Sequence, residues 1–332
     1  MKILIKIEIV ILVLALLAGT AMVLISEGVL NLFYDPIVIE HAVEPIPTDA
    51  AVEPVAAEEI VPEETKAEKK TSSRTITAQK YFAYDTRDNA FVSTKGDVDE
   101  KLYPASITKL LTSYVVLQHM KPEDTVKVGD ALELVQPDSS VAGLETGDKL
   151  TVEQLIAAMM LPSGNDAAQV AAVAAGRAIA GDKNLDYKKA VDVFMDEMNK
   201  QAQAIGMKNS HFVTPDGFHD SNHYTTMSDL VLLSKKVLTD QTILKYASST
   251  KSTAQLSGRK LEWKNTNAFL HSDSSTYLPN TVGLKTGYTD KAGNCLVSAF
   301  FMEDRMLIIG VFGCAKGNEN RYLDSLAIYN SI

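Results

Sequence analysis

Three short motifs stand in one order along this chain, and together they limit the folds that it can adopt. They are Ser106-Ile-Thr-Lys109, Ser163-Gly-Asn165 and Lys285-Thr-Gly287. Each is short enough to occur by chance, but a serine–lysine acyl-transfer site needs all three parts. If the motifs act together, the fold must bring three distant segments of the chain into one site. Their order and spacing therefore carry more weight than any one of them.

Hydrophobic periodicity predicts a folded unit that begins near Thr77, with strands toward its two ends and helices in its middle. Stripes of apolar residues predict helices over residues 105–119, 152–160, 165–179, 187–204, 228–238 and 320–329. Apolar or alternating runs predict strands over residues 81–85, 90–94, 281–288, 295–301 and 306–312. The first two strands are expected to form a hairpin. Strands from both ends then assemble into one antiparallel sheet flanked by helices.

The extreme N-terminus predicts a membrane segment. An apolar run from Ile9 to Ile25 follows Lys2 and Lys6, and apolar residues resume soon after it. This pattern favours an uncleaved anchor over residues 1–34, with the rest of the chain exported. A cleaved signal peptide stays open as the alternative, because Gly19-Thr-Ala21 is a small-residue site at a suitable distance. In both cases the body of the chain is expected outside the cytoplasm, anchored to the membrane or secreted.

Residues 35–75 predict a disordered linker between this segment and a catalytic domain over residues 76–332. The linker holds five of the eleven prolines, is rich in Glu and Ala, and shows no helical or strand periodicity. It also supplies most of the formal net charge of −10. The rest of the chain has no basic stripe, so nucleic acid is not expected as a partner.

The first motif predicts a nucleophile and its base. Ser106 and Lys109 are three residues apart on a predicted helix and share one face of it, while Ile107 and Leu110 face the core. A serine attacks only after a neighbour removes its proton, and a lysine does this only when neutral. Burial and the second cation, Lys285, are expected to lower the pKa of Lys109. Taken alone, the motif would equally describe a helix N-cap beside a solvated lysine.

The second motif lies in a predicted tight loop between two helices. The Ser163 hydroxyl is expected to relay a proton to the leaving group, and the Asn165 amide to bind a substrate carbonyl or steady Lys109. A plain turn with a helix N-cap would use the same residue types. Either Asn165 or Asp166 is suited to cap the following helix, and Asp166 is expected to cap or brace it rather than act on substrate.

The third motif lies on a predicted strand. Lys285 is expected to present a positive charge to a terminal carboxylate of the substrate, and the Thr286 hydroxyl to hydrogen-bond that group. Gly287 lets the strand backbone approach a ligand closely, so that an extended peptide can lie beside it like an added strand.

In these motifs the sequence resembles the penicillin-recognising enzymes, and most of all the low-molecular-mass D-alanyl-D-alanine carboxypeptidases. The likeness spans roughly residues 76–332 and includes Pro104-Ala-Ser106, the run from Met160 to Ala167, and the run from Gly283 to Asp290. It implies an α+β fold of the serine β-lactamase/transpeptidase kind. Such a fold has an antiparallel sheet of about five strands flanked by helices, with an all-helical subregion. No cofactor and no metal are implied.

The resemblance also implies an activity in cell-wall synthesis and cell shape. Ser106 attacks the penultimate D-alanine carbonyl of a peptidoglycan pentapeptide stem, D-alanine leaves, and water hydrolyses the acyl-enzyme. β-Lactam antibiotics acylate the same serine. The backbone N–H groups of Ser106 and Tyr288 form the implied oxyanion hole. Relatives often carry a carboxylate-binding arginine after a Lys-Gly pair, where this chain has Asn318, and Arg321 is expected to take that role.

Two other functions remain open. A β-lactamase of the class A kind needs a glutamate in an E-x-x-L-N context between the second and third motifs. Neither Glu197 nor Glu262 has that context. A penicillin-binding sensor or scaffold would be acylated without turnover, but it needs a transducing partner domain, for which the N-terminal segment offers little.

The cysteines and histidines are expected to be structural. Cys295 and Cys314 lie on either side of the last predicted hairpin in a diagonal placement that is too distant for a disulfide, so both are expected to be free thiols. His211, His219 and His223 are not needed as bases, because a lysine already supplies that role. No Cys/His spacing predicts a metal site.

Overall fold

The computed structural model describes residues 74–256, 258–302 and 304–332. The predicted anchor over residues 1–34, and all of the predicted linker over 35–75 except its last two residues, lie outside this part of the chain. Among the described residues, no helix has both the length and the apolar character needed to cross a membrane.

One five-stranded antiparallel sheet forms the frame of the fold, as expected. Its strand order is β2-β1-β9-β8-β7, so the first hairpin pairs directly with the last strand. The sheet therefore joins the two ends of the folded unit, and β7 is an edge strand that pairs only with β8 among the described strands. The strands are β1 (Lys80–Asp85), β2 (Ala90–Lys95), β7 (Thr281–Thr289), β8 (Gly293–Met302) and β9 (Arg305–Cys314).

Both faces of this sheet are covered, which explains why the sequences of β8 and β9 are almost continuously apolar. Along β9, Ile308 packs into the larger core cluster, whereas Leu307 and Ile309 pack into a second cluster with Tyr322 and Ile328. The alternation shows the period of two of a strand whose two faces are both buried. Helix α8 (Asn320–Tyr329) covers one face, and helices from the middle of the chain cover the other.

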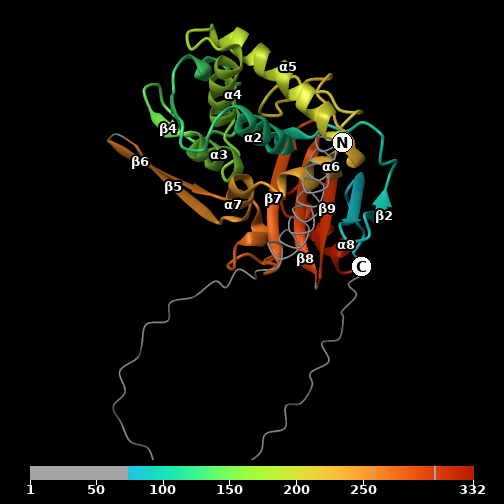
Figure 1. Ribbon diagram of the computed structural model, residues 1–332. Coiled ribbons are helices and arrows are strands. Elements are labelled where there is room, and N and C mark those ends of the chain that lie inside the picture. The colour runs from blue at the N-terminus through green and yellow to red at the C-terminus, as the bar shows by residue number, and fades with distance from the viewer. Residues whose placement is uncertain (1–73, 257, 303) are drawn as a thin grey trace, which may run out of the picture. The chain divides into compact units, whose positions relative to one another are not determined.

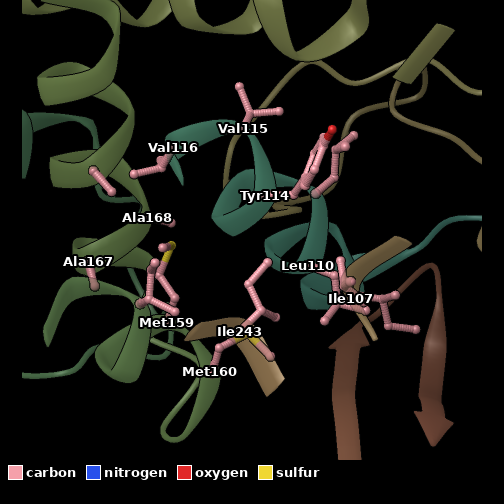
Figure 2. Close-up of a cluster of buried hydrophobic side chains, with 14 of the residues drawn as sticks. Ile107, Leu110, Tyr114, Val115, Val116, Met159, Met160, Ala167, Ala168 and Ile243 are labelled. Carbon is pink, nitrogen blue, oxygen red and sulfur yellow. The ribbon is translucent and has the colours of Figure 1, made fainter. Parts of the chain in front are cut away.

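The all-helical subregion lies together at one end of the sheet (Figure 1). Its centre is α2, whose apolar side chains meet those of α3, α4 and α7 in one buried cluster (Figure 2). α4 and α5 pack very closely, because a Cβ at Gly176 would lie only 1.9 Å from Ala190 O. The helices are α2 (Thr108–His119), α3 (Val152–Met160), α4 (Asn165–Ala180), α5 (Tyr187–Ile205), α6 (Met227–Val237) and α7 (Gln241–Ser248).

Several short elements have no counterpart among the predicted ones. They are α7, the ribbon of β3 (Thr125–Lys127) with β4 (Lys149–Thr151), and the hairpin of β5 (Lys251–Leu256) with β6 (Arg259–Lys264). The β5–β6 hairpin projects away from the sheet (Figure 1). Its strands are mostly polar, with Ala254, Leu256 and Trp263 as the buried positions, so their apolar alternation is too sparse to predict a strand.

A buried carboxylate ties the two ends of the folded unit together. Asp324 on α8 accepts hydrogen bonds from the backbone N–H groups of Thr77 (3.1 Å) and Ala78 (2.8 Å), and from the Thr77 hydroxyl at 2.7 Å. Arg74 lies 3.4 Å from the same carboxylate. This cluster fixes the start of the first strand against the last helix.

Replacing Asp324 should therefore destabilise the whole domain. We expect Asp324→Ala to lower the free energy of unfolding by about 3 kcal/mol, because it leaves buried N–H groups without a partner. The measurement is urea unfolding of residues 74–332. Glu319→Ala, which removes an exposed acid at the start of the same helix, is the control and should change this value by less than about 0.5 kcal/mol. Equal effects of the two substitutions would contradict the role of Asp324.

Candidate active site

The three sequence motifs meet at one cleft of about 1210 Å³. The first motif contributes the single 3₁₀ turn (Ala105–Ile107) that precedes α2, the second the loop between α3 and α4, and the third the strand β7. Residues 137–140, which precede α3 in the chain, and the start of α8 also line the cleft. Predicted site residues that line it are Ser106, Ser163, Asn165, Thr286, Gly287, Tyr288 and Arg321.

Lys109 is buried behind this cleft and its amine is held by three oxygen atoms. Nζ lies 2.9 Å from Ser106 Oγ, 2.8 Å from Asn165 Oδ1 and 2.7 Å from Asp216 O. The two carbonyl oxygens can accept the two hydrogens of a neutral amine. The lone pair of that amine then faces Ser106 Oγ, which is the arrangement a general base needs.

Burial sets the protonation of this amine. It lowers the pKa of Lys109 to about 8, although the nearby carboxylates of Asp216 and Asp166 act in the opposite direction. A neutral fraction is therefore available near neutral pH. Burial is the largest cause of this shift, and the contribution expected from Lys285 stays a prediction.

Lys285 does not line the cleft. Its side chain is buried and Nζ donates to Thr286 O at 3.1 Å. Burial holds the pKa of Lys285 well below its ordinary value, and the charges of Lys109 and Arg321 lower it further. The neighbouring Thr286 hydroxyl does reach the cleft, where it lies 2.7 Å from Thr266 Oγ1. Of this pair, Thr286 is the residue placed to touch a ligand.

Gly287 allows β7 to run directly against the segment that carries Ser106. A Cβ at Gly287 would lie 3.0 Å from Pro104 O and 3.2 Å from Ser106 N, closer than nearly all real contacts of that atom. Ala105 and Ser163, neither of which is glycine, have positive φ values of 49° and 65°. Such backbone strain costs free energy and persists only where the surroundings enforce it. Here it lies beside Ser106 and within the second motif.

Asp166 braces a loop, and it also accepts the N–H of Ala167 in the first turn of its own helix at 2.8 Å. Its carboxylate accepts hydrogen bonds from the N–H groups of Ala142 (2.8 Å), Gly143 (2.9 Å) and Leu144 (3.0 Å). The N-cap position of α4 is Gly164, which offers no side chain for a cap. The prediction that Asn165 or Asp166 caps this helix is therefore wrong. The physical reason is that three backbone donors of another segment take the carboxylate.

Arg321 reaches the cleft from α8, but its guanidinium group is already engaged. It donates to Gly287 O at 3.1 Å, Cys295 O at 3.2 Å and Asn318 Oδ1 at 2.8 Å, and it also contacts Asn294 Oδ1. These bonds hold the end of β7 in place. Carboxylate binding by Arg321 stays a prediction.

Sequence reasoning missed some groups that complete the site. Asp216 contributes its backbone carbonyl to Lys109, and its carboxylate accepts from Gln169 Nε2 at 3.1 Å and from Phe218 N at 2.8 Å. Thr266 pairs with Thr286. A backbone carbonyl has no residue-type signature. The only signal near Asp216 was the turn chemistry of Thr214-Pro-Asp-Gly217.

His223 holds the loop that carries Asp216. Its Nδ1 accepts from the backbone N–H groups of Val213 (3.1 Å) and Thr214 (3.3 Å), so its hydrogen is on Nε2, which lies 2.8 Å from Thr108 Oγ1. Burial lowers the pKa of His223 to about 4, which keeps the ring neutral. This agrees with the structural role expected for it, whereas His219 lines the cleft.

Both cysteines are buried free thiols, as expected. Burial raises the pKa of Cys295 to about 11. A thiol with so high a pKa holds little reactive thiolate at neutral pH.

The chain matches the family model described as D-alanyl-D-alanine carboxypeptidase over residues 65–316. The chain belongs to this family. Among curated members, it is 28% identical to DacF of Bacillus subtilis over 238 residues, which is 70% of this chain and 57% of that protein. It is 32% identical to DacA of Haemophilus influenzae over 242 residues, 71% of this chain and 56% of that one. The chain thus spans a little over half the length of these relatives.

Solved structures of penicillin-recognising proteins share this D-alanyl-D-alanine carboxypeptidase fold. The DD-transpeptidase of Streptomyces K15 is 29% identical and has a TM-score of 0.69. The match covers 77% of this chain and 97% of that one. The penicillin-binding protein D2 of Listeria monocytogenes, solved in a cefotaxime-bound form, is 25% identical with a TM-score of 0.63, over 77% of this chain and 97% of the other. The expected transpeptidase-like fold class is confirmed.

The role of His223 predicts a pH-dependent stability. The unfolded chain binds the proton near the ordinary pKa of 6.5 and the folded chain only near 4, so stability falls as the pH falls between these values. We expect a loss of about 2 to 3 kcal/mol between pH 7 and pH 4 that His223→Gln does not share. Urea unfolding of both proteins across this range is the measurement. If the difference in unfolding free energy between wild type and His223→Gln stayed constant with pH, this prediction would be wrong.

Proposed function

We propose that this chain is a serine-type D-Ala-D-Ala carboxypeptidase that removes the terminal D-alanine from peptidoglycan pentapeptide stems. The observation that carries the proposal is the 2.9 Å approach of Lys109 Nζ to Ser106 Oγ, in a cleft bordered by β7. Membership of the family supports the same reaction. No cofactor enters it.

The first step is acylation of Ser106. Neutral Lys109 takes the hydroxyl proton as Oγ forms a bond to the carbonyl carbon of the penultimate D-alanine. The free edge of β7 pairs with the extended peptide, and the close approach at Gly287 sets the peptide beside Ser106. The N–H groups of Ser106 and Tyr288 stabilise the oxyanion, an effect of about 3 to 4 kcal/mol for one such donor.

The leaving D-alanine needs a proton on its nitrogen and a partner for its carboxylate. Ser163 lines the cleft and is only 6% exposed, and we assign it the relay of the proton from Lys109. Thr286 donates its hydroxyl to the carboxylate. The positive charge of Arg321, which lines the cleft, favours that anion through the electrostatic field, whereas burial disfavours the charged form of Lys285. Asn165 keeps Lys109 in place, and water then hydrolyses the acyl-enzyme.

The two glutamates considered for a class A β-lactamase, Glu197 and Glu262, are not placed for that role. Glu197 is bonded to His119 at 3.2 Å and to Gln201 at 2.8 Å, and Glu262 is paired with the neighbouring Lys260. Neither glutamate lines the cleft. A sensor or scaffold that is acylated without turnover is the other alternative, and product release separates it from a carboxypeptidase.

The remaining parts of the proposal concern partners and location. We infer that β-lactams acylate Ser106, because the fold is similar to that of a penicillin-binding protein that was solved in a cefotaxime-bound form. A peptidoglycan substrate places the catalytic domain outside the cytoplasm. Membrane attachment through residues 1–34 rests on the sequence pattern of that segment alone.

Release of free D-alanine from diacetyl-L-Lys-D-Ala-D-Ala tests the activity. We expect steady release by the wild type and a loss of about a thousandfold or more for Ser106→Ala. Ser113→Ala is the matched control, because it removes a buried hydroxyl without a partner on α2, seven residues after Ser106, and it should keep full activity. A folded wild type that takes up penicillin but releases no D-alanine would make the chain a sensor or scaffold. Penicillin turnover of many per second would make it a β-lactamase.

A further inference from the structure

One wall of the cleft is a loop that the hairpin β5–β6 holds from outside. We call residues Pro137–Asp148 the wall loop. Its residues 137–140 line the cleft, and its next residues are fixed on two sides. From α4, Asp166 accepts the N–H groups of residues 142–144. From β6, Trp263 and Arg259 donate to its carbonyl and carboxylate oxygens.

The contacts from β6 are direct and partly buried. Trp263 is 4% exposed and its Nε1 donates to Ala142 O at 2.8 Å. Arg259 donates to Gly143 O at 2.9 Å and to Glu145 Oε1 at 2.7 Å, and it also pairs with Asp148. Both backbone polar groups of Ala142 are thus satisfied, the N–H by Asp166 and the carbonyl by Trp263.

The wall loop is in turn connected to the catalytic amine by two steps. Two residues before Ala142, Ser140 O accepts the backbone N–H of Asn165 at 2.7 Å. Asn165 Oδ1 lies 2.8 Å from Lys109 Nζ. A second connection is steric, because a Cβ at Gly164 would lie 2.7 Å from Ala142 Cβ. Movement of Ala142 is therefore passed on to the turn that carries Ser163 and Asn165.

We propose that Trp263 is a positioning residue for the acyl-transfer reaction. Its indole N–H fixes Ala142, the wall loop fixes Asn165, and Asn165 keeps the Lys109 amine aimed at Ser106. This inference rests on the proposed function. It assigns a part in catalysis to a residue of the projecting hairpin that does not line the cleft. Loss of the N–H should slow the chemical step more than it weakens binding.

The test removes this one hydrogen bond. Trp263 is the only tryptophan in the chain, so biosynthetic replacement of tryptophan changes a single side chain. β-(3-Benzothienyl)alanine has nearly the same shape but no N–H, whereas 7-azatryptophan keeps the N–H and serves as the rescue. Stopped-flow acylation by benzylpenicillin at saturation gives the rate constant of the chemical step, and its concentration dependence gives the dissociation constant.

We expect the benzothienyl protein to be acylated about two- to tenfold more slowly at saturation, the equivalent of one lost hydrogen bond. Its dissociation constant should be unchanged, and 7-azatryptophan should restore the rate. Trp263→Phe, which also lacks the N–H, should repeat the loss. Ser234→Ala is the control for stability alone. It removes a buried 2.7 Å bond to Leu230 O in α6, away from the cleft, and should leave the rate constant unchanged.

The outcomes separate this inference from the proposed function. Equal rate constants for the benzothienyl, 7-azatryptophan and wild-type proteins would show that Trp263 is structural only, and the inference would fail while the proposed function stands. A slower reaction in the Ser234→Ala protein as well would attribute the loss to stability and overturn the inference in the same way. No acylation of the wild type would overturn both.

Discussion

The site depends on a lysine amine that is buried without a carboxylate partner. Lys109 is fully buried, and carbonyl oxygens rather than carboxylates accept from its amine. Burial disfavours the charged form and so makes the amine a base near neutral pH. The carbonyl groups of Asn165 and Asp216 orient that amine toward Ser106. Each is fixed by a separate part of the fold, Asn165 through the wall loop and Asp216 through the loop that His223 holds.

Much of the fold could be predicted, because its sheet strands and long helices have clear periodicity. The predicted helix over residues 320–329 coincides with α8, and the pairing of β1 with β9 follows from strands at both ends of the domain. The short elements were not predicted, because a strand such as β6 buries little more than Trp263 and so shows no clear apolar alternation. The cap of α4 was also misjudged, because the residue types that cap helices serve equally well to hold another loop.

The motif residues could be predicted as a set, but their supports could not. Ser106, Lys109 and Thr286 have side chains whose chemistry is visible in the sequence. Backbone carbonyls such as Asp216 O and Ser140 O have none, and their positions depend on tertiary packing. The same holds for Trp263, which sequence alone would treat as a core residue. Lys285 shows the reverse case, because its residue type suggested ligand contact, whereas the fold buries its side chain.

The pH dependence of Ser106 acylation tests the central claim most directly. The measurement is the rate of the benzylpenicillin adduct, followed by intact mass from pH 6 to pH 10, on wild type and Ser106→Ala. With neutral Lys109 as the base, the wild-type rate should rise with pH and level off above an apparent pKa of about 8. The alanine variant should form no adduct. A rate that is independent of pH, or an adduct on the variant, would contradict the assignment of Lys109 and Ser106.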